Sequence, residues 1–226
     1  MIEPIVYDFL KDLKVNNNRE WFAEHKPRFQ AAKLSFENSI QQFIEMIHKE
    51  DPSIGLPAPK DCVFRIYRDT RFAKDKTPYK TNMGAYVVNG GRKSPMGGYY
   101  IHIEPGASFV AGGIYCPPSD VLKKVRKEVY NFSDEFKEII YDKQFKKLFP
   151  SLYEDKLKMA PKGFPKDFED VDLLKYKSYI VSQELKDEEL TGEKAKSILT
   201  KAIKTLRPLN DFINRGVASD EEEITL

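Results

Sequence analysis

The stretch MGAYVVNGGRKSPMGGYYIHIEPGASFVAGGIY, residues 83–115, decides the fold class. Three runs within it alternate apolar and polar side chains, the period-two pattern of strands that bury one face. The runs are Met83–Val88, Tyr99–Glu104 and Ser108–Tyr115. The links between them, marked by Asn89-Gly90-Gly91 and Pro105-Gly106, are short and favour antiparallel hairpins over parallel crossovers. This stretch therefore predicts an antiparallel sheet.

A further strand is expected upstream at Cys62–Arg68, where Phe64 and Ile66 alternate with Arg65 and Tyr67. The sequence before and after the sheet region changes to helical spacing of apolar residues. Helices, then strands, then helices predict an α+β fold. We expect a central antiparallel β-sheet of about four or more strands, covered by N-terminal and C-terminal helices.

The N-terminal region also contains helix-end signals. Asn17 followed by Glu20 resembles a capping box, which predicts a short helix carrying Trp21 and Phe22 and ending before Pro27. Because Trp21 is the only tryptophan of the chain and lies beside a capped turn, we expect both rings to be structural. A long helix is expected to begin at Pro27.

Composition bounds the class of protein. The chain of 226 residues is 41% hydrophobic, which is enough for a sizeable core, and we expect one domain over residues 1–216 and an acidic, disordered tail over 217–226. A net charge of +2 gives no global electrostatic case for nucleic-acid or membrane binding. The first residues do not read as a signal peptide, no stretch is long enough to cross a bilayer, and Cys62 and Cys116 form no CxxC pattern. A cytoplasmic protein is therefore predicted.

Residues 65–80, RIYRDTRFAKDKTPYK, concentrate positive charge in a chain that is otherwise near balance. The cations are Arg65, Arg68, Arg71, Lys74, Lys76 and Lys80, and Thr70, Thr77 and Tyr79 add hydroxyl groups. Guanidinium groups fit phosphate or carboxylate at two points, and ammonium groups supply point charges. The candidate anion-binding residues are Arg65, Arg68, Arg71, Lys76, Tyr79 and Lys80. The alternative is that Asp69 and Asp75 pair with neighbouring cations and lock a loop whose remaining charges are solvated.

A second candidate group lies on the predicted strand at residues 99–104. Tyr100, His102 and Glu104 alternate with apolar residues, so one strand face presents a hydroxyl, an imidazole and a carboxylate. His102 is the natural proton-transfer residue of such a set, and Asp69 is a second candidate. The alternative is an ordinary solvated face of an antiparallel sheet.

Other chemical motifs are absent from the sequence. The three histidines form no pair at metal-ligand spacing, so no metal site is predicted. The patterns GxxxxGK[ST], GxGxxG after a strand, and GxSxG do not occur, and no cofactor is predicted.

Several motifs occur in an order that resembles the bacterial and fungal family called domain of unknown function 2461. They are FLKDLKVNNNREWFAEHKPRF, RIYRDTRFAKDKTPYKTN, GGYYIHIEP with GGIYCPP, MAPKGF, and DLLKYKSYIV. The resemblance runs from about Phe9 to Ile180, and its most specific blocks are NNNREWF and RDTRFAKDKTPYK. It implies a shared fold and a shared Arg/Asp/Lys block.

Two hypotheses of function follow. The first is a binding or enzymatic site for a phosphorylated or other anionic small molecule, with the basic residues as a cradle and His102 or Asp69 as proton carrier. The second is a non-enzymatic interaction module in which the basic block meets an acidic protein or a nucleic-acid backbone. The sequence does not decide whether the protein is an enzyme.

Overall fold

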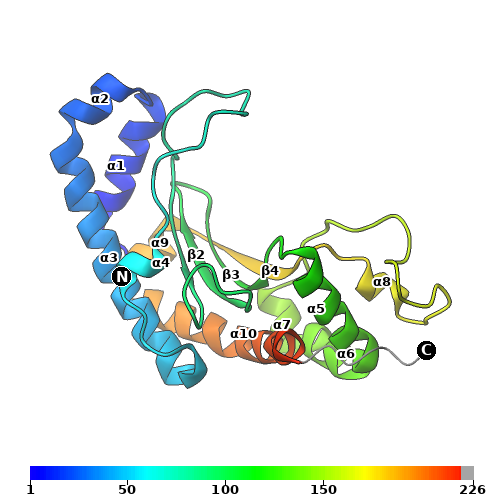
Figure 1. The fold of residues 1–226 in the computed structure, drawn as a ribbon. Coiled ribbons are helices and arrows are strands. Elements are labelled where there is room, and N and C mark those ends of the chain that lie inside the picture. The colour runs from blue at the N-terminus through cyan, green and yellow to red at the C-terminus, as the bar shows by residue number, and fades with distance from the viewer. Residues whose placement is uncertain (220–226) are drawn as a thin grey trace. The chain divides into compact units, whose positions relative to one another are not determined.

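The computed structural model describes residues 1–219, and Figure 1 shows the course of the chain. Contacts within the chain divide it into two compact units. Unit 1 comprises Met1–Arg92, Tyr100–Val110 and Glu184–Ile203, and unit 2 comprises Lys93–Tyr99, Ala111–Gln183 and Lys204–Leu226. Strands β2, β3 and β4 each contribute residues to both units. The expectation of one domain over 1–216 stays a prediction.

The sheet has four strands in the order β1-β2-β3-β4 and is antiparallel. Its strands are β1 (Met83–Val87), β2 (Gly98–Ile103), β3 (Ser108–Ile114) and β4 (Tyr179–Leu185). The first three follow the three runs predicted from residues 83–115. In β2, Tyr99, Ile101 and Ile103 are fully buried, whereas Tyr100 and His102 lie on the opposite, partly open face. The α+β prediction is confirmed.

The prediction that Cys62–Arg68 forms a strand of this sheet was wrong. Val63 forms only an isolated bridge with Ala85 of β1, and Phe64 N–H donates to Gly84 O at 2.9 Å. After Phe64 the backbone turns away from β1. Its next backbone hydrogen bonds join Ile66 to Lys80 and Arg68 to Pro78. The fourth strand is β4, which lies more than sixty residues after β3 in the sequence.

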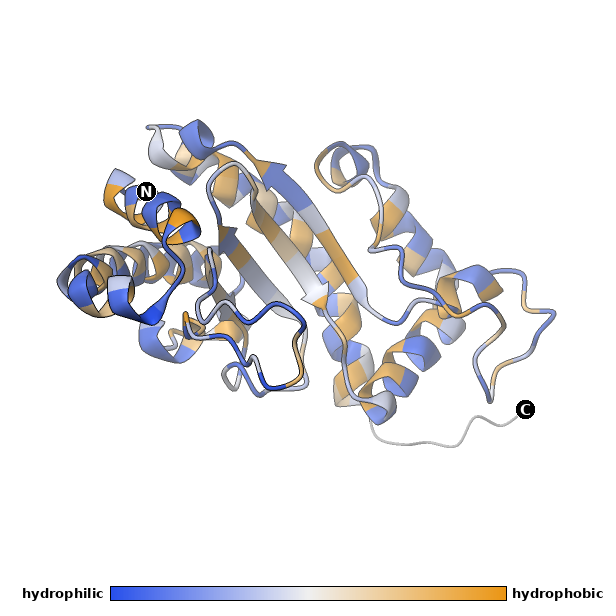
Figure 2. Ribbon diagram, turned by 90° about the horizontal axis from the view of Figure 1, so that it is seen from above, coloured by the Kyte–Doolittle hydropathy of each residue, from blue (hydrophilic) through white to orange (hydrophobic). Residues whose placement is uncertain are grey.

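Helices make up most of the remaining chain. They carry both apolar and polar residues, as the hydropathy colours of Figure 2 show. In unit 1 they are α1 (Pro4–Val15), α2 (Arg19–Glu24), α3 (Lys26–Glu50), the 3-10 helix η1 (Pro52–Ile54), α4 (Pro59–Cys62) and α9 (Asp187–Thr191). In unit 2 they are α5 (Ser119–Asn131), α6 (Ser133–Tyr141), α7 (Lys143–Leu148) and α8 (Val171–Leu174). The last helix, α10 (Ala195–Ala218), has residues in both units.

The expected cap of α2 is displaced by one residue. Asn18, not Asn17, is the N-cap, and its Oδ1 accepts from Trp21 N–H at 2.9 Å. Asn17 instead binds the backbone of Tyr79 in both directions, donating through Nδ2 to the carbonyl at 2.9 Å and accepting from the N–H at 3.1 Å. This pair of bonds ties the end of the basic segment to the helices of unit 1.

The C-terminal helix contains Pro208 and still runs to Ala218, so it includes the first two residues of the predicted tail. Residues 220–226, the rest of that tail, lie outside the described residues. In unit 2, α10 packs closely on β3, because a side chain at Gly112 would overlap Leu206. Asn214 Oδ1 accepts from Gly97 N–H at 2.7 Å and fixes the same helix against the start of β2.

Candidate functional site

Residues 67–79 form a closed loop, called here the basic loop. An isolated bridge joins Tyr67 and Tyr79 at its base. Two further backbone bonds reinforce the base, from Arg68 N–H to Pro78 O at 2.9 Å and from Lys80 N–H to Ile66 O at 2.8 Å. The loop therefore leaves and re-enters the body of unit 1 at one place.

Most cations of the basic loop hold the loop itself together. Arg68 Nη1 donates to Asp75 Oδ2 at 2.5 Å and also to Thr77 Oγ1. Arg71 and Asp69 form a two-point pair, with Nε–Oδ1 at 3.0 Å and Nη2–Oδ2 at 2.7 Å. These two pairs are the internal pairings that the sequence offered as an alternative to an anion site.

Lys76 and Tyr79 also have partners within the protein. The Lys76 ammonium donates to Thr70 O at 2.9 Å and so bridges the loop. Tyr79 is buried, and its ring stacks on Phe22 of α2 with centroids 3.9 Å apart. Burial raises the pKa of Tyr79, so its phenol stays neutral. Tyr79 thus lies in an aromatic core and not on an open surface.

Hydrogen bonds lower the pKa values of both loop carboxyls. The pKa of Asp75 falls to about 2, chiefly because Arg68 donates to it and also because the Thr77 backbone and hydroxyl do. The Arg71 pair lowers the pKa of Asp69. A lowered pKa makes Asp69 a weak base, which disfavours the role of proton carrier that the sequence suggested.

Arg65 and Lys80 differ from the other candidate cations. Among residues 1–219, neither side chain forms an ion pair with a carboxylate. Arg65 is exposed, whereas Lys80 is half-buried, with its Nζ 5.6 Å from the centre of the Phe64 ring. Burial, and secondly the charge of Arg65, lowers the pKa of Lys80. Two neighbouring cations therefore lie together with no ion-paired carboxylate among the described residues, although the charge of Arg65 also helps to lower the pKa of Asp69.

The predicted group on β2 forms a chain of hydrogen bonds on one strand face. Tyr100 Oη lies 3.0 Å from His102 Nδ1, and His102 Nε2 lies 3.2 Å from Glu104 Oε2. Since the carboxylate can only accept, Nε2 carries a proton, and in the neutral ring Nδ1 accepts from the Tyr100 hydroxyl. The side chains thus form a donor-to-acceptor series from Tyr100 through His102 to Glu104.

Neighbouring strands fix this series in place. The His102 ring stacks on Phe109 of β3, with centroids 4.6 Å apart and planes inclined by 13°. Thr81 Oγ1 donates to Glu104 Oε1 at 3.2 Å. Tyr100 crosses β1 at Gly84, where an added Cβ would overlap the Tyr100 hydroxyl and lie 3.0 Å from its Cζ. Burial raises the pKa of Tyr100 to about 12, so its phenol remains protonated at neutral pH.

Phe64 connects Lys80 to the hydrogen-bonded series. Its ring centroid lies 6.2 Å from that of Tyr100, and Lys80 Nζ lies 5.6 Å from the same ring. Arg92 approaches it as well, with its guanidinium carbon 5.4 Å from the ring centre. We call Arg65, Lys80, Tyr100, His102 and Glu104 the sheet-face site.

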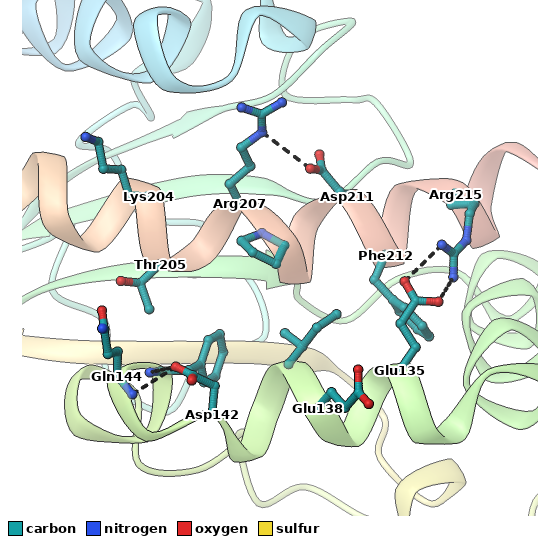
Figure 3. Close-up of a pocket in the computed structure, with 13 residues that line it drawn as sticks. Glu135, Glu138, Asp142, Gln144, Lys204, Thr205, Arg207, Asp211, Phe212 and Arg215 are labelled. Carbon is teal, nitrogen blue, oxygen red and sulfur yellow. Dashed lines mark hydrogen bonds and ion pairs between the residues drawn. The ribbon is translucent and has the colours of Figure 1, made fainter.

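A separate pocket in unit 2 was not expected from the sequence. It has a volume of about 840 Å³ and lies between α6–α7 and α10 (Figure 3). Arg215 donates to Glu135 at 2.6 and 3.0 Å, and Arg207 pairs with Asp211 at 3.4 Å. The pocket is lined by four acidic and three basic side chains, so their charges nearly cancel.

Among residues 1–219, no group of three or more His, Cys, Asp or Glu side chains is placed to hold a metal ion. Within the same residues, no helix combines the length and apolar character needed to cross a membrane.

Fold and site together define an α+β protein with a polar sheet face beside a closed basic loop. The chain belongs to the family described as Conserved hypothetical protein (DUF2461), whose model matches residues 6–212. The resemblance seen in the motifs is thereby confirmed. Searches among curated proteins and among solved structures found no match.

Proposed function

We propose that the sheet-face site binds a phosphorylated or other anionic small molecule, with Arg65 and Lys80 holding the anion. The observation that carries this proposal is the half-buried ammonium of Lys80, which has no carboxylate partner among the described residues and whose pKa is lowered by burial and by Arg65. Burying a charge without a partner is unfavourable, and a second cation nearby adds to the cost. A bound anion would relieve both effects.

The hydrogen-bonded series beside these cations supports a role in proton transfer. His102 is oriented by Glu104 and faces the Tyr100 hydroxyl, an arrangement in which an imidazole can accept a proton while a carboxylate stabilises the resulting cation. The proposal therefore assigns proton transfer to His102. Tyr100 would contact the ligand, and Glu104 would position the imidazole.

Binding of inorganic phosphate and phenyl phosphate by calorimetry at low salt tests the proposal. Lys80→Met keeps an unbranched side chain beside Phe64 and removes the charge, and Arg65→Gln removes the second cation. A charge-assisted contact contributes about 1.5–3 kcal/mol, so each change should weaken binding by roughly ten- to a hundred-fold. His102→Gln should leave phosphate affinity nearly unchanged, because His102 is proposed to transfer a proton and not to hold the phosphate.

Lys60→Met is the matched control, because Lys60 is an exposed lysine of α4 in the same unit. It should bind both ligands like wild type. The proposal fails if wild type binds neither ligand, or if Lys60→Met weakens binding as much as Lys80→Met does. The alternative function, an interaction module, would involve the basic loop.

A further inference from the structure

The basic loop presents one aromatic ring almost entirely to solvent. Phe72 is 95% exposed, more than any other large hydrophobic residue among those the structure describes. Isolated exposed apolar residues are common on proteins, so the ring is informative only together with the cations that flank it. In the sequence the ring is flanked by Arg71 on one side and by Lys74 and Lys76 on the other.

The loop that carries Phe72 is held by its own side chains. Asp75 accepts from Thr77 N–H at 2.9 Å and from Arg68, while Lys76 donates to Thr70 O. The base is closed by the Tyr67–Tyr79 bridge and tied to Asn17. Because these contacts already order the backbone, a partner that meets Phe72 loses less affinity to loop ordering.

The charge of the loop favours an anionic partner. Residues 67–79 contain four cations, Arg68, Arg71, Lys74 and Lys76, against Asp69 and Asp75, a net charge of +2. Arg71 uses Nε and Nη2 for Asp69, so its Nη1 takes no part in that pair. Lys74 makes no ion pair among residues 1–219.

From these features we infer that the basic loop binds single-stranded nucleic acid, with Phe72 stacking on one base and Arg71 and Lys74 contacting the adjacent phosphates. An exposed aromatic face with flanking cations is the combination that binds single strands without strong sequence preference. A duplex keeps its bases stacked inside, so a ring at a loop tip needs an unpaired base. This inference does not depend on the sheet-face site.

Stacking also suits the loop better than insertion into a protein pocket or a lipid surface. The carboxylates of Asp69 and Asp75 lie three residues from Phe72, and their side chains are 46% and 60% exposed. Insertion of the ring would remove these carboxylates from water or bring them against anionic headgroups, at a cost in free energy. A base that stacks on one face of the ring leaves them solvated.

Fluorescence anisotropy at low salt tests the inference with two probes of equal phosphate number, a short oligothymidylate and an abasic strand of the same length. We expect wild type to bind the oligothymidylate about tenfold more tightly, in line with the loss seen when a stacking residue is replaced. Phe72→Trp should keep this preference. Phe72→Leu, which stays apolar but loses the aromatic face, should abolish it.

Charge contacts are tested by the dependence of affinity on salt. Lys74→Ala should reduce the slope of log K against log salt by about 0.7, the value for one phosphate contact on a single strand, and should affect both probes equally. Met159→Ala and Lys158→Ala are the matched controls, because both residues are exposed on a loop of unit 2. Both should behave like wild type.

Three results would overturn the inference. They are failure of wild type to bind either strand, equal binding of the two strands, and a preference for bases that survives in Phe72→Leu. Vesicles of phosphatidylglycerol provide the comparison with a lipid surface. If they bind wild type in a Phe72-dependent way while the strands do not, the loop recognises lipid and the inference is wrong.

Discussion

Two aspartates, Asp69 and Asp75, hold the basic loop through hydrogen bonds to its own residues. Asp75 accepts from the Arg68 side chain and from Thr77, and Asp69 holds the guanidinium of Arg71 at two points. Each carboxylate is thus engaged by a neighbour no more than seven residues away. Such exposed pairs contribute little to global stability, but together they favour one local backbone conformation.

Acid should loosen the basic loop. The pKa of Asp75 in the folded loop is about 2, below the ordinary value of 3.8, so the ionised form favours the folded loop. This contribution is fully present above the ordinary value and is lost as the pH falls through about 2. NMR titration of the Asp75 carboxyl carbon and of the Phe72 amide should show coincident transitions. In Asp75→Asn the Phe72 transition should become smaller, because only the Asp69–Arg71 pair remains to titrate. A Phe72 transition of unchanged size would show that Asp75 does not hold the loop.

The sequence located the candidate residues better than it assigned their roles. Charge density singled out residues 65–80, and strand alternation placed Tyr100, His102 and Glu104 on one face, as the structure shows. It could not distinguish cations with internal partners, such as Arg68, from Lys80, which has none among the described residues. That distinction depends on which side chains the loop closure brings together.

The sheet-face site depends on a close contact between strands β1 and β2. β1 can pass beneath Tyr100 because Gly84 has no side chain, and that passage lets the phenol reach His102. The sequence showed a glycine in a strand, which marks a close approach of another group, but it did not indicate which group.

Gly84→Ala should destabilise the protein by about 1–3 kcal/mol, because the new methyl group overlaps the Tyr100 ring. In a Tyr100→Phe background the same change should cost less, since the closest atom has been removed. Urea denaturation of both single variants and the double variant measures this coupling. Additive costs would mean that the two residues do not contact each other as described.

Helix α2 carries two adjacent aromatic residues with different roles. Phe22 is buried and stacks on Tyr79, whereas Trp21 is half-exposed and stacks on His25 with centroids 4.3 Å apart. The sequence treated both rings as structural because they share a capped helix. It could not rank them, because the partner of Phe22 is fifty-seven residues away in the chain.

Phe22→Ala should therefore cost about 3–5 kcal/mol of unfolding free energy, the usual loss for a buried aromatic ring. Trp21→Ala should cost only about 1 kcal/mol, since a half-exposed ring buries less apolar surface. Thermal and urea unfolding of the two variants, each compared with wild type, measures the difference. A larger loss for Trp21→Ala would contradict the packing described here.

The α+β class of the whole molecule could be predicted because the patterns that define it are local. Hairpin links and strand alternation specified β1, β2 and β3, and helical spacing specified the flanking helices. Membership of the sheet could not be predicted for distant segments. Residues 62–68 alternate like a strand yet turn toward their own loop, while Tyr179–Leu185 joins the sheet after a long intervening segment.

The folded protein leaves the charge of Lys80 half-buried without a carboxylate partner among the described residues. NMR of the Lys80 ε-methylene group, with and without inorganic phosphate, measures the pKa of this ammonium. We expect a pKa below the ordinary value of 10.5 in the free protein, because of burial and the charge of Arg65, and a rise when phosphate is added. An ordinary pKa that does not respond to phosphate would contradict this prediction.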